Sequence, residues 1–508
     1  MLCKSLSYSD SPIKEMRLDD DLRYFETQEF KDILAKYETA REAGSPIYMD
    51  ADELTDVAEY YALVAHDDHR ADQAVELARQ LHPEAVDPQI FQARQLMLAG
   101  DNQRALEICN AISDQQHREV YFLRAELMVR DGRNTEASNF LLDRSEEVTE
   151  DRDYFLFDSA YIFIDYHDSK SASVFAELLE QMAPKWFKTW ELQADICLAE
   201  DNNEKALTYI EQMLDKDPFY LAAWNWRAEA YCGLQDFNKA CESTDFALAV
   251  EPRNERALEL KAWVLMRQGN LDEAHELYSQ LRQMNPDSEI HCLYDSFCLF
   301  DKEQYDEAQK LIERAEELAD GMSQEQTAIY EHHAHILSVL GNVDEALHYV
   351  DLAEKAAQAD EAKEEDKLQD FDFYRARVYA DNGYSEQALH FIRDVIERET
   401  ENLPDVIMQS GQIFVEAGDY SCALEFFCML MENMEDEELH NKVYPYLALC
   451  YHELDNSELC LKNIKLAVEH HSPDMQELLG YIFAEGVQPA EYYDYYYYRL
   501  YGQWPTSE

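Results

Sequence analysis

The chain has 508 residues, which is enough for about three domains of ordinary size. Gly and Pro number only 13 each, which argues against a β-rich or collagen-like protein, and 46% hydrophobic with 12% aromatic residues excludes a disordered acidic tail. The 106 acidic and 43 basic residues give a net charge of −63, which disfavours nucleic acid and anionic membrane surfaces as partners.

Residues 1–19 are expected to be a flexible N-terminal tail. They contain no apolar segment of signal-peptide length, and no run in the chain approaches the ~18 apolar residues of a membrane helix. The 11 cysteines include no CxxC pair, which fits a reducing compartment. A cytoplasmic protein is therefore expected.

Residues 20–54 are expected to form an N-terminal capping helix and a linker. The apolar positions within 20–43 recur at helical spacing, and they are Leu22, Phe25, Phe30, Ile33, Leu34 and Tyr37. We expect one amphipathic helix here, covering the first of the repeats that follow.

Residues 55–474 repeat a short pattern with a period close to 34. A small residue ends a phrase such as GNLDEA at Ala74, Ala105, Ala137, Ala172, Ala206, Ala240, Ala274, Ala308, Ala346, Ala388, Ala423 and Cys460. A second small residue stands twelve positions earlier, at Ala62, Ala93, Ala125, Ala160, Ala194, Ala228, Ala262, Ser296, Ala334, Ala376, Gly411 and Ala448. Small residues at two fixed points allow two antiparallel helices to approach closely. Proline twelve positions after the first set would end the second helix, at Pro184, Pro218, Pro252 and Pro286.

This pattern resembles the tetratricopeptide repeat, whose signature is W-x2-L-G-x2-Y, then A-x3-F, then A and P over 34 residues. The resemblance is strongest from Lys188 to Pro286, where Trp190 and Trp224 stand at the signature position. It implies an all-α fold, namely a right-handed α-solenoid of about twelve helix pairs with N- and C-terminal capping helices.

Two later segments depart from the repeat. The charged insert 356–369 is expected to lengthen a helix and to form a solvated loop, with a docking arm as the alternative. Residues 475–508 are expected to form Tyr-rich capping helices. One face of the last helix should pack on a helix Met475–Phe483, and it holds Tyr493, Tyr496, Tyr497 and Leu500. Tyr492, Tyr495 and Tyr498 should point elsewhere. The Tyr-rich segment would serve either as a cap of the array or as a surface for docking another copy or a partner.

The resemblance also implies that the first helix of each pair lines a concave groove. The candidate partner-binding residues at the matching positions are Phe122, Tyr154, Phe157, Tyr161, Glu191, Asp195, Asn225, Glu229, Glu259, Trp263, Phe297 and Phe300. Aromatic patches flanked by carboxylates would suit an extended peptide with apolar anchors and basic residues. The alternative is that the same residues are buried by packing within the array.

Catalytic and metal-binding patterns are weak in this chain. No G-x-S-x-G nucleophile motif and no glycine-rich phosphate loop occurs. His332 and His335 share a helix face, but no carboxylate or Cys completes an obvious metal site. The Lys, Asn and Arg clamp by which some tetratricopeptide proteins hold chaperone tails is absent, because only Asn225 matches it. We therefore predict no catalytic, cofactor-binding or metal-binding residue.

The function expected is a non-catalytic protein-interaction scaffold. Its partner would be a protein or peptide, with a basic segment as one candidate, and neither nucleic acid nor a membrane. A regulatory sensor whose superhelix changes when a peptide binds is the first alternative. A metalloprotein or an enzyme is the second.

Overall fold

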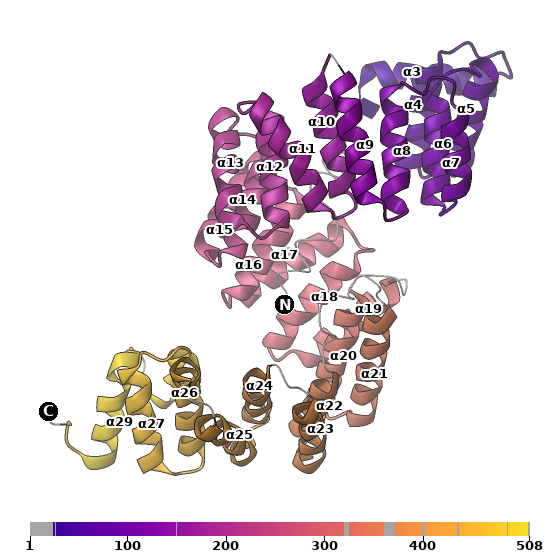
Figure 1. Ribbon diagram of the computed structural model, residues 1–508. Helices are drawn as coiled ribbons and strands as arrows, with labels where there is room; N and C mark the ends of the chain where they lie inside the picture. The colour runs from indigo at the N-terminus through magenta and orange to yellow at the C-terminus, as the bar shows by residue number, and fades with distance from the viewer. Residues whose placement is uncertain are drawn as a thin grey trace. The chain divides into compact units, whose positions relative to one another are not determined.

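The computed structural model describes residues 24–25, 27–148, 150–319, 325–359, 371–398, 402–433, 436–484 and 486–505. Residues 1–23 and 360–370 lie outside this set, and with them the predicted tail and most of the predicted insert. The chain divides into two compact units, Met1–Asn270 (unit 1) and Leu271–Glu508 (unit 2), and each is described by itself. The described residues form 27 α-helices and no β-strand (Figure 1). None of these helices combines the length and the apolar character that crossing a membrane requires.

Unit 1 consists of α3 (Gln28–Glu42) followed by helix pairs. The first helices of the pairs are α4 (Ala51–Leu63), α6 (Asp87–Leu98), α8 (Arg118–Arg130), α10 (Arg152–Ile164), α12 (Phe187–Ala199), α14 (Leu221–Gly233) and α16 (Glu255–Arg267). The second helices are α5 (Asp68–Leu81), α7 (Asn102–Ala111), α9 (Asn134–Glu147), α11 (Ser169–Met182), α13 (Asn203–Lys216) and α15 (Phe237–Val250). From α4 to α14, each first helix contacts its own second helix and the first helix of the next pair.

Unit 2 begins with α17 (Leu271–Met284), which follows α16 in the sequence, and contains five helix pairs of its own. Their first helices are α18 (Glu289–Asp301), α20 (Gln326–Val339), α22 (Phe371–Asp381), α24 (Leu403–Glu416) and α26 (Glu437–Glu453). Their second helices are α19 (Tyr305–Leu318), α21 (Val343–Ala359), α23 (Ser385–Arg398), α25 (Tyr420–Asn433) and α27 (Ser457–Glu469). The predicted twelve pairs are thus confirmed.

The small residues occupy the predicted helix crossings in eleven pairs. In each of these the residue that ends the repeated phrase is the fourth residue of the second helix and is fully buried, from Ala105 to Cys460. The first pair differs, because the fourth residue of α5 is Ala71 and the buried small residue of α4 is Ala58, whereas Ala62 is only half-buried. The predicted register is therefore wrong for this pair.

The turn inside each pair has a common backbone design. A residue with positive φ ends each first helix: in six pairs it is glycine, such as Gly269 (φ 79°), and in six it is another residue, such as Gln235 (φ 58°). The left-handed conformation lets the last carbonyls of the helix accept hydrogen bonds. Asp or Asn then caps several second helices, as when the side chain of Asp236 accepts a hydrogen bond from the Lys239 backbone N–H.

The N-terminal helix is shorter than expected. Instead of one helix over 20–43, α3 begins at Gln28, because the Thr27 side chain accepts a hydrogen bond from the Phe30 N–H and caps it. Phe25 lies before this cap and packs edge-on against Phe30, with ring centroids 4.7 Å apart. Tyr37 is buried against Tyr61 of α4, so α3 does pack on the first pair.

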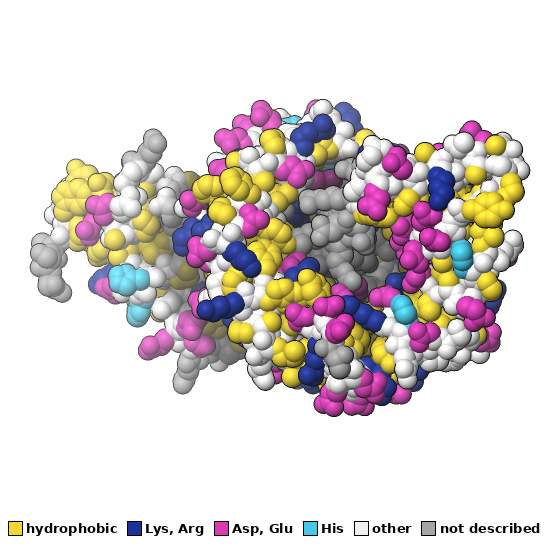
Figure 2. All heavy atoms as spheres, turned by 90° about the horizontal axis from the view of Figure 1, so that it is seen from above, with side chains coloured by type: hydrophobic (Ala, Val, Ile, Leu, Met, Phe, Trp, Pro, Cys, Tyr) yellow, Lys and Arg dark blue, Asp and Glu magenta, His cyan; other side chains and the backbone are white. Residues whose placement is uncertain are grey.

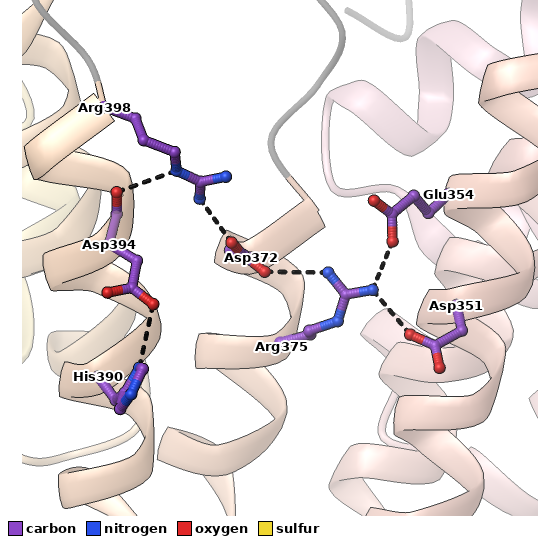
Figure 3. A network of polar contacts seen from close by, with 7 residues as sticks. All are labelled: Asp351, Glu354, Asp372, Arg375, His390, Asp394 and Arg398. Atoms are coloured by element: carbon purple, nitrogen blue, oxygen red, sulfur yellow. Dashed lines mark hydrogen bonds and ion pairs between the residues drawn. The ribbon is translucent and has the colours of Figure 1, made fainter.

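An ion network joins α21, α22 and α23 beside the insert (Figure 3). The guanidinium of Arg375 contacts Asp351 at 2.7 Å, Glu354 at 2.5 Å and Asp372 at 3.0 Å. Asp372 also pairs with Arg398 at 2.5 Å. Burial alone would lower the pKa of Arg375, but the hydrogen bonds that its guanidinium donates to these carboxylates raise it. The 17-residue α21 confirms that the insert lengthens a helix, and the network holds that helix to its neighbours.

The C-terminal end of unit 2 holds α28 (Met475–Leu479), two 3-10 turns (Gly480–Ile482 and Pro489–Glu491) and α29 (Tyr492–Tyr501). The predicted helix Met475–Phe483 is thus interrupted at Gly480. Tyr496 is buried as predicted, but Tyr492, which was expected to point elsewhere, is fully buried. Its ring stacks on Phe483 with a centroid distance of 4.0 Å, because the chain doubles back between the two residues.

Candidate functional site

The first helices of unit 1 form a continuous face, here called the first-helix face. Helix α8 contacts α10, α10 contacts α12, α12 contacts α14, and α14 contacts α16. Figure 2 shows acidic and hydrophobic side chains interspersed over the visible surface of the molecule, with Lys and Arg set among them. Eight of the twelve predicted partner-binding residues lie on α10, α12, α14 and the start of α16, from Tyr154 to Glu259.

Aromatic rings gather at the α10 end of this face. The Tyr154 ring lies 4.8 Å from that of Trp186, and the Phe157 ring lies 5.9 Å from Trp186 and 4.7 Å from Tyr161. Tyr154 is 44% exposed, whereas Phe157 and Tyr161 are buried. We call Tyr154, Phe157, Tyr161 and Trp186 the aromatic corner. It offers one accessible ring supported by three others.

Lys188 joins the aromatic corner to neighbouring carboxylates. Its Nζ lies 4.5 Å from the centroid of the Phe157 ring, a cation–π distance, and 4.0 Å from Glu191 Oε2. The hydroxyl of Tyr220 donates a hydrogen bond to Glu191 Oε1 at 3.3 Å. A positively charged group can therefore rest between an aromatic ring and a carboxylate at this place.

Carboxylates continue along the face from α12 to α16. Glu191 and Asp195 of α12 are buried, and Glu229 of α14 lies 3.3 Å from Arg256, which also pairs with Glu259 at 3.7 Å. Burial raises the pKa of the Glu229 carboxyl, although the Arg256 guanidinium opposes the shift. We call Glu191, Asp195, Glu229 and Glu259 the carboxylate row. These four carboxylates outnumber the two neighbouring cations, Lys188 and Arg256, so the net charge of this part of the face is negative.

Asn225 of α14 adds an uncharged polar group to the row. Its side chain is only 8% exposed, and Nδ2 donates to Asn254 Oδ1 at 3.0 Å. Its Oδ1 has no hydrogen-bond partner in the described part of the chain. A buried carbonyl oxygen without a donor is unfavourable by ~1–3 kcal/mol, so it is ready to accept a hydrogen bond from a ligand.

The alternative interpretation, burial by packing within the array, is correct for several predicted residues. Phe122 stacks on Phe155 with centroids 5.1 Å apart, and both rings are buried. Trp263 is also buried and packs edge-on against Phe237 at 6.0 Å. Like Phe157 and Tyr161, these two rings are buried in the array.

The two predicted aromatic residues of unit 2 pack against histidines. The Phe297 ring lies 3.9 Å from His332, and the Phe300 ring lies 4.5 Å from His335. His332 is buried, and its Nε2 lies 3.1 Å from Ser296 Oγ, which donates to the Ala308 carbonyl at 2.8 Å. Because that hydroxyl has one hydrogen, His332 Nε2–H is the donor in this pair. These histidines take part in helix packing.

Sequence reasoning missed the residues that precede the first helices. Trp186, Tyr220 and Asn254 immediately precede α12, α14 and α16 and are 34 residues apart. All three contact predicted site residues: Tyr154, Glu191 and Asn225. The repeat period itself was the signal, because one turn position recurs as regularly as the helix positions do.

No protein-family model and no curated relative matches the chain. Among solved structures, a tetratricopeptide repeat protein from Parabacteroides merdae is 17% identical, with a TM-score of 0.41, over 54% of this chain and 99% of its own. YrrB, described as a TPR protein with an unusual peptide-binding site, is 16% identical, with a TM-score of 0.29, over 37% and 94%. A monomeric IFIT1 mutant with Gppp-AAAA is 15% identical, with a TM-score of 0.38, over 93% and 100%. The twelve helix pairs with small residues at their crossings make the chain a tetratricopeptide-type repeat array.

Proposed function

We propose that this protein is a non-catalytic interaction scaffold that binds an extended peptide segment on the first-helix face of unit 1. The segment would carry an apolar side chain for the aromatic corner and basic side chains for the carboxylate row. The observation that carries the proposal is the position of Lys188, between the Phe157 ring and Glu191. It shows that an ammonium group and an aromatic surface fit side by side here.

Physical considerations support a peptide ligand of this kind. A central aromatic anchor commonly supplies most of the binding energy of an interface, and Tyr154 is the accessible ring. The negative row would attract basic side chains and would help to set the register of the peptide. The buried Oδ1 of Asn225 could accept a hydrogen bond from a backbone N–H of the ligand.

A selection from a random peptide library on the full-length protein tests the proposal. We expect the selected peptides to combine an aromatic or aliphatic residue with nearby Lys or Arg. Binding should weaken when salt rises from 0.1 M to 1 M, because the Debye length falls from ~10 Å to ~3 Å. Peptides without basic residues, or binding that is indifferent to salt, would contradict the proposal.

A pair of tyrosine variants locates the binding site. Tyr154→Ala should weaken binding of the selected peptides about tenfold or more, as expected for an aromatic anchor. Tyr384→Ala in unit 2 is the matched control, because Tyr384 is 47% exposed and also makes an edge-on aromatic contact. Equal losses in the two variants would show that the peptides bind elsewhere.

A further inference from the structure

We propose that the first-helix face of unit 1 has an internal occupant, residues 1–17 of the same chain, which competes with the external peptide. The inference rests on the proposed function, because it assigns a regulator to the same site.

The composition of residues 1–17, MLCKSLSYSDSPIKEMR, matches the face. Lys4, Lys14 and Arg17 outnumber Asp10 and Glu15, so the segment is net positive in a chain whose net charge is −63. Between the charges stand apolar residues that could enter the aromatic corner: Leu2, Leu6, Tyr8, Ile13 and Met16. These are the two kinds of side chain that the proposed function assigns to ligands of the face.

Tyr24 and Phe25, the first two described residues, are held against unit 1. The hydroxyl of Tyr24 donates to Asp56 Oδ2 of α4 at 2.6 Å, and Phe25 is buried. The 23 residues that precede Tyr24 can span up to about 80 Å when extended, at ~3.3–3.6 Å per residue. From α4 to α16 there are six steps between first helices in contact, each ~8–10 Å, or ~48–60 Å. The segment is therefore long enough to reach both the aromatic corner and the carboxylate row.

Attachment to the same chain would make this competitor effective. A tethered ligand has an effective concentration in the millimolar range, so even a weak intramolecular interaction reduces the affinity for an external peptide. A partner with a better apolar anchor or more basic residues would displace it. The protein would then respond only to ligands above a threshold affinity.

The test uses the full-length protein and a fluorescent synthetic peptide of residues 1–17 as the probe. In the variant Lys4→Glu/Lys14→Glu/Arg17→Glu, the segment can no longer bind the negative face. We expect this variant to bind the probe at least about tenfold more tightly than the parent chain, as measured by fluorescence anisotropy. Adding Tyr154→Ala to it should abolish the gain.

A charge-matched control variant shows whether the effect comes from the charges of residues 1–17 or from the net charge of the protein. Arg79→Glu/Arg104→Glu/Arg133→Glu changes the net charge equally, at exposed side chains of unit 1. Equal binding of the probe by the parent and both variants would overturn the inference, as would no binding to any of them. If the probe does not bind but selected library peptides still require Tyr154, only this inference fails. If the probe binds but no library peptide does, only the proposed function fails.

Discussion

The indole Nε1–H of Trp224 donates a hydrogen bond to the backbone carbonyl of Pro218 at 2.9 Å. Thirty-four residues earlier, Trp190 donates to the Pro184 carbonyl at the same distance. Each tryptophan thus ties the start of a first helix to the turn that precedes it. This contact gives a physical reason for a tryptophan and a proline to recur together at fixed spacing.

Trp224→Phe should reduce the free energy of unfolding by about 1 kcal/mol, the net value of one hydrogen bond, while keeping the stacking on Phe246. Denaturant unfolding measures the change. Trp504→Phe is the control, since Trp504 is 53% exposed. A loss of the same size in both variants would show that the bond to Pro218 contributes nothing specific.

The corrected register of the first pair predicts different effects at Ala58 and Ala62. Ala58→Leu should overpack the crossing of α4 and α5 and destabilise the protein by ~1–3 kcal/mol, because Ala58 is fully buried. Ala62→Leu, at a half-buried site, should cost less than half as much. The two variants can be compared by thermal unfolding, and the reverse order would restore the register expected from the sequence.

Acid should destabilise unit 2 through His332. Burial lowers the pKa of His332 to about 3, helped by the charge of His335. In the unfolded chain a histidine takes up its proton near pH 6.5, so protons favour the unfolded state between pH 6.5 and 3. Stability contributed by neutral His332 is complete above pH 6.5 and is lost as the pH falls, by up to ~1.4 kcal/mol per pH unit.

His332→Gln should therefore flatten the pH dependence of stability between pH 6.5 and 4.5, whatever it does to stability at pH 7. His390→Gln serves as the control, because the His390 side chain is 74% exposed. Denaturant midpoints at several pH values measure both slopes. The same slope in all three proteins would mean that His332 does not remain neutral in the folded state.

Tyr492 should contribute more to folding than the exposed tyrosines of α29 do. Its ring stacks on Phe483, and its hydroxyl donates to Gln476 Oε1 at 2.8 Å. Tyr492→Ala should cost about 3 kcal/mol or more and expose the end of the array. Tyr495→Ala, at a residue that is 41% exposed, should cost less than about 1 kcal/mol. Equal losses on thermal unfolding would mean that α29 is held by its outer face.

The sequence predicted the features that depend on spacing alone. Close helix crossings require small residues, which is why Ala105 and its equivalents could be identified without coordinates. The first pair was misread because alanines recur in α5, where Ala71, Ala74 and Ala78 are all buried, so residue type alone does not identify the one at the helix crossing. Tyr492 was misread because the predicted face was counted from Tyr493, although Tyr492 lies four residues before Tyr496 and shares its side of α29.

The candidate site was harder to predict, because burial depends on neighbouring repeats. Phe122 and Phe157 occupy the same position in successive pairs and are both buried, beside Phe155 and Trp186 respectively, whereas Tyr154, which lies about one helical turn before Phe157, remains accessible. The partners in the turns, such as Trp186, lie outside the helix positions that were considered. Residue type and spacing predicted a mixture of aromatic and acidic residues, but not which of them a ligand could touch.

The contacts between successive helices have a consequence for how this long chain folds. Each helix contacts mainly those one or two places along the sequence, so most native contacts close loops of a few tens of residues. Folding speed follows the sequence distance between contacting residues more than total length. Folding can therefore begin at more than one place in the array and spread to neighbouring pairs, without a long-range contact having to form first.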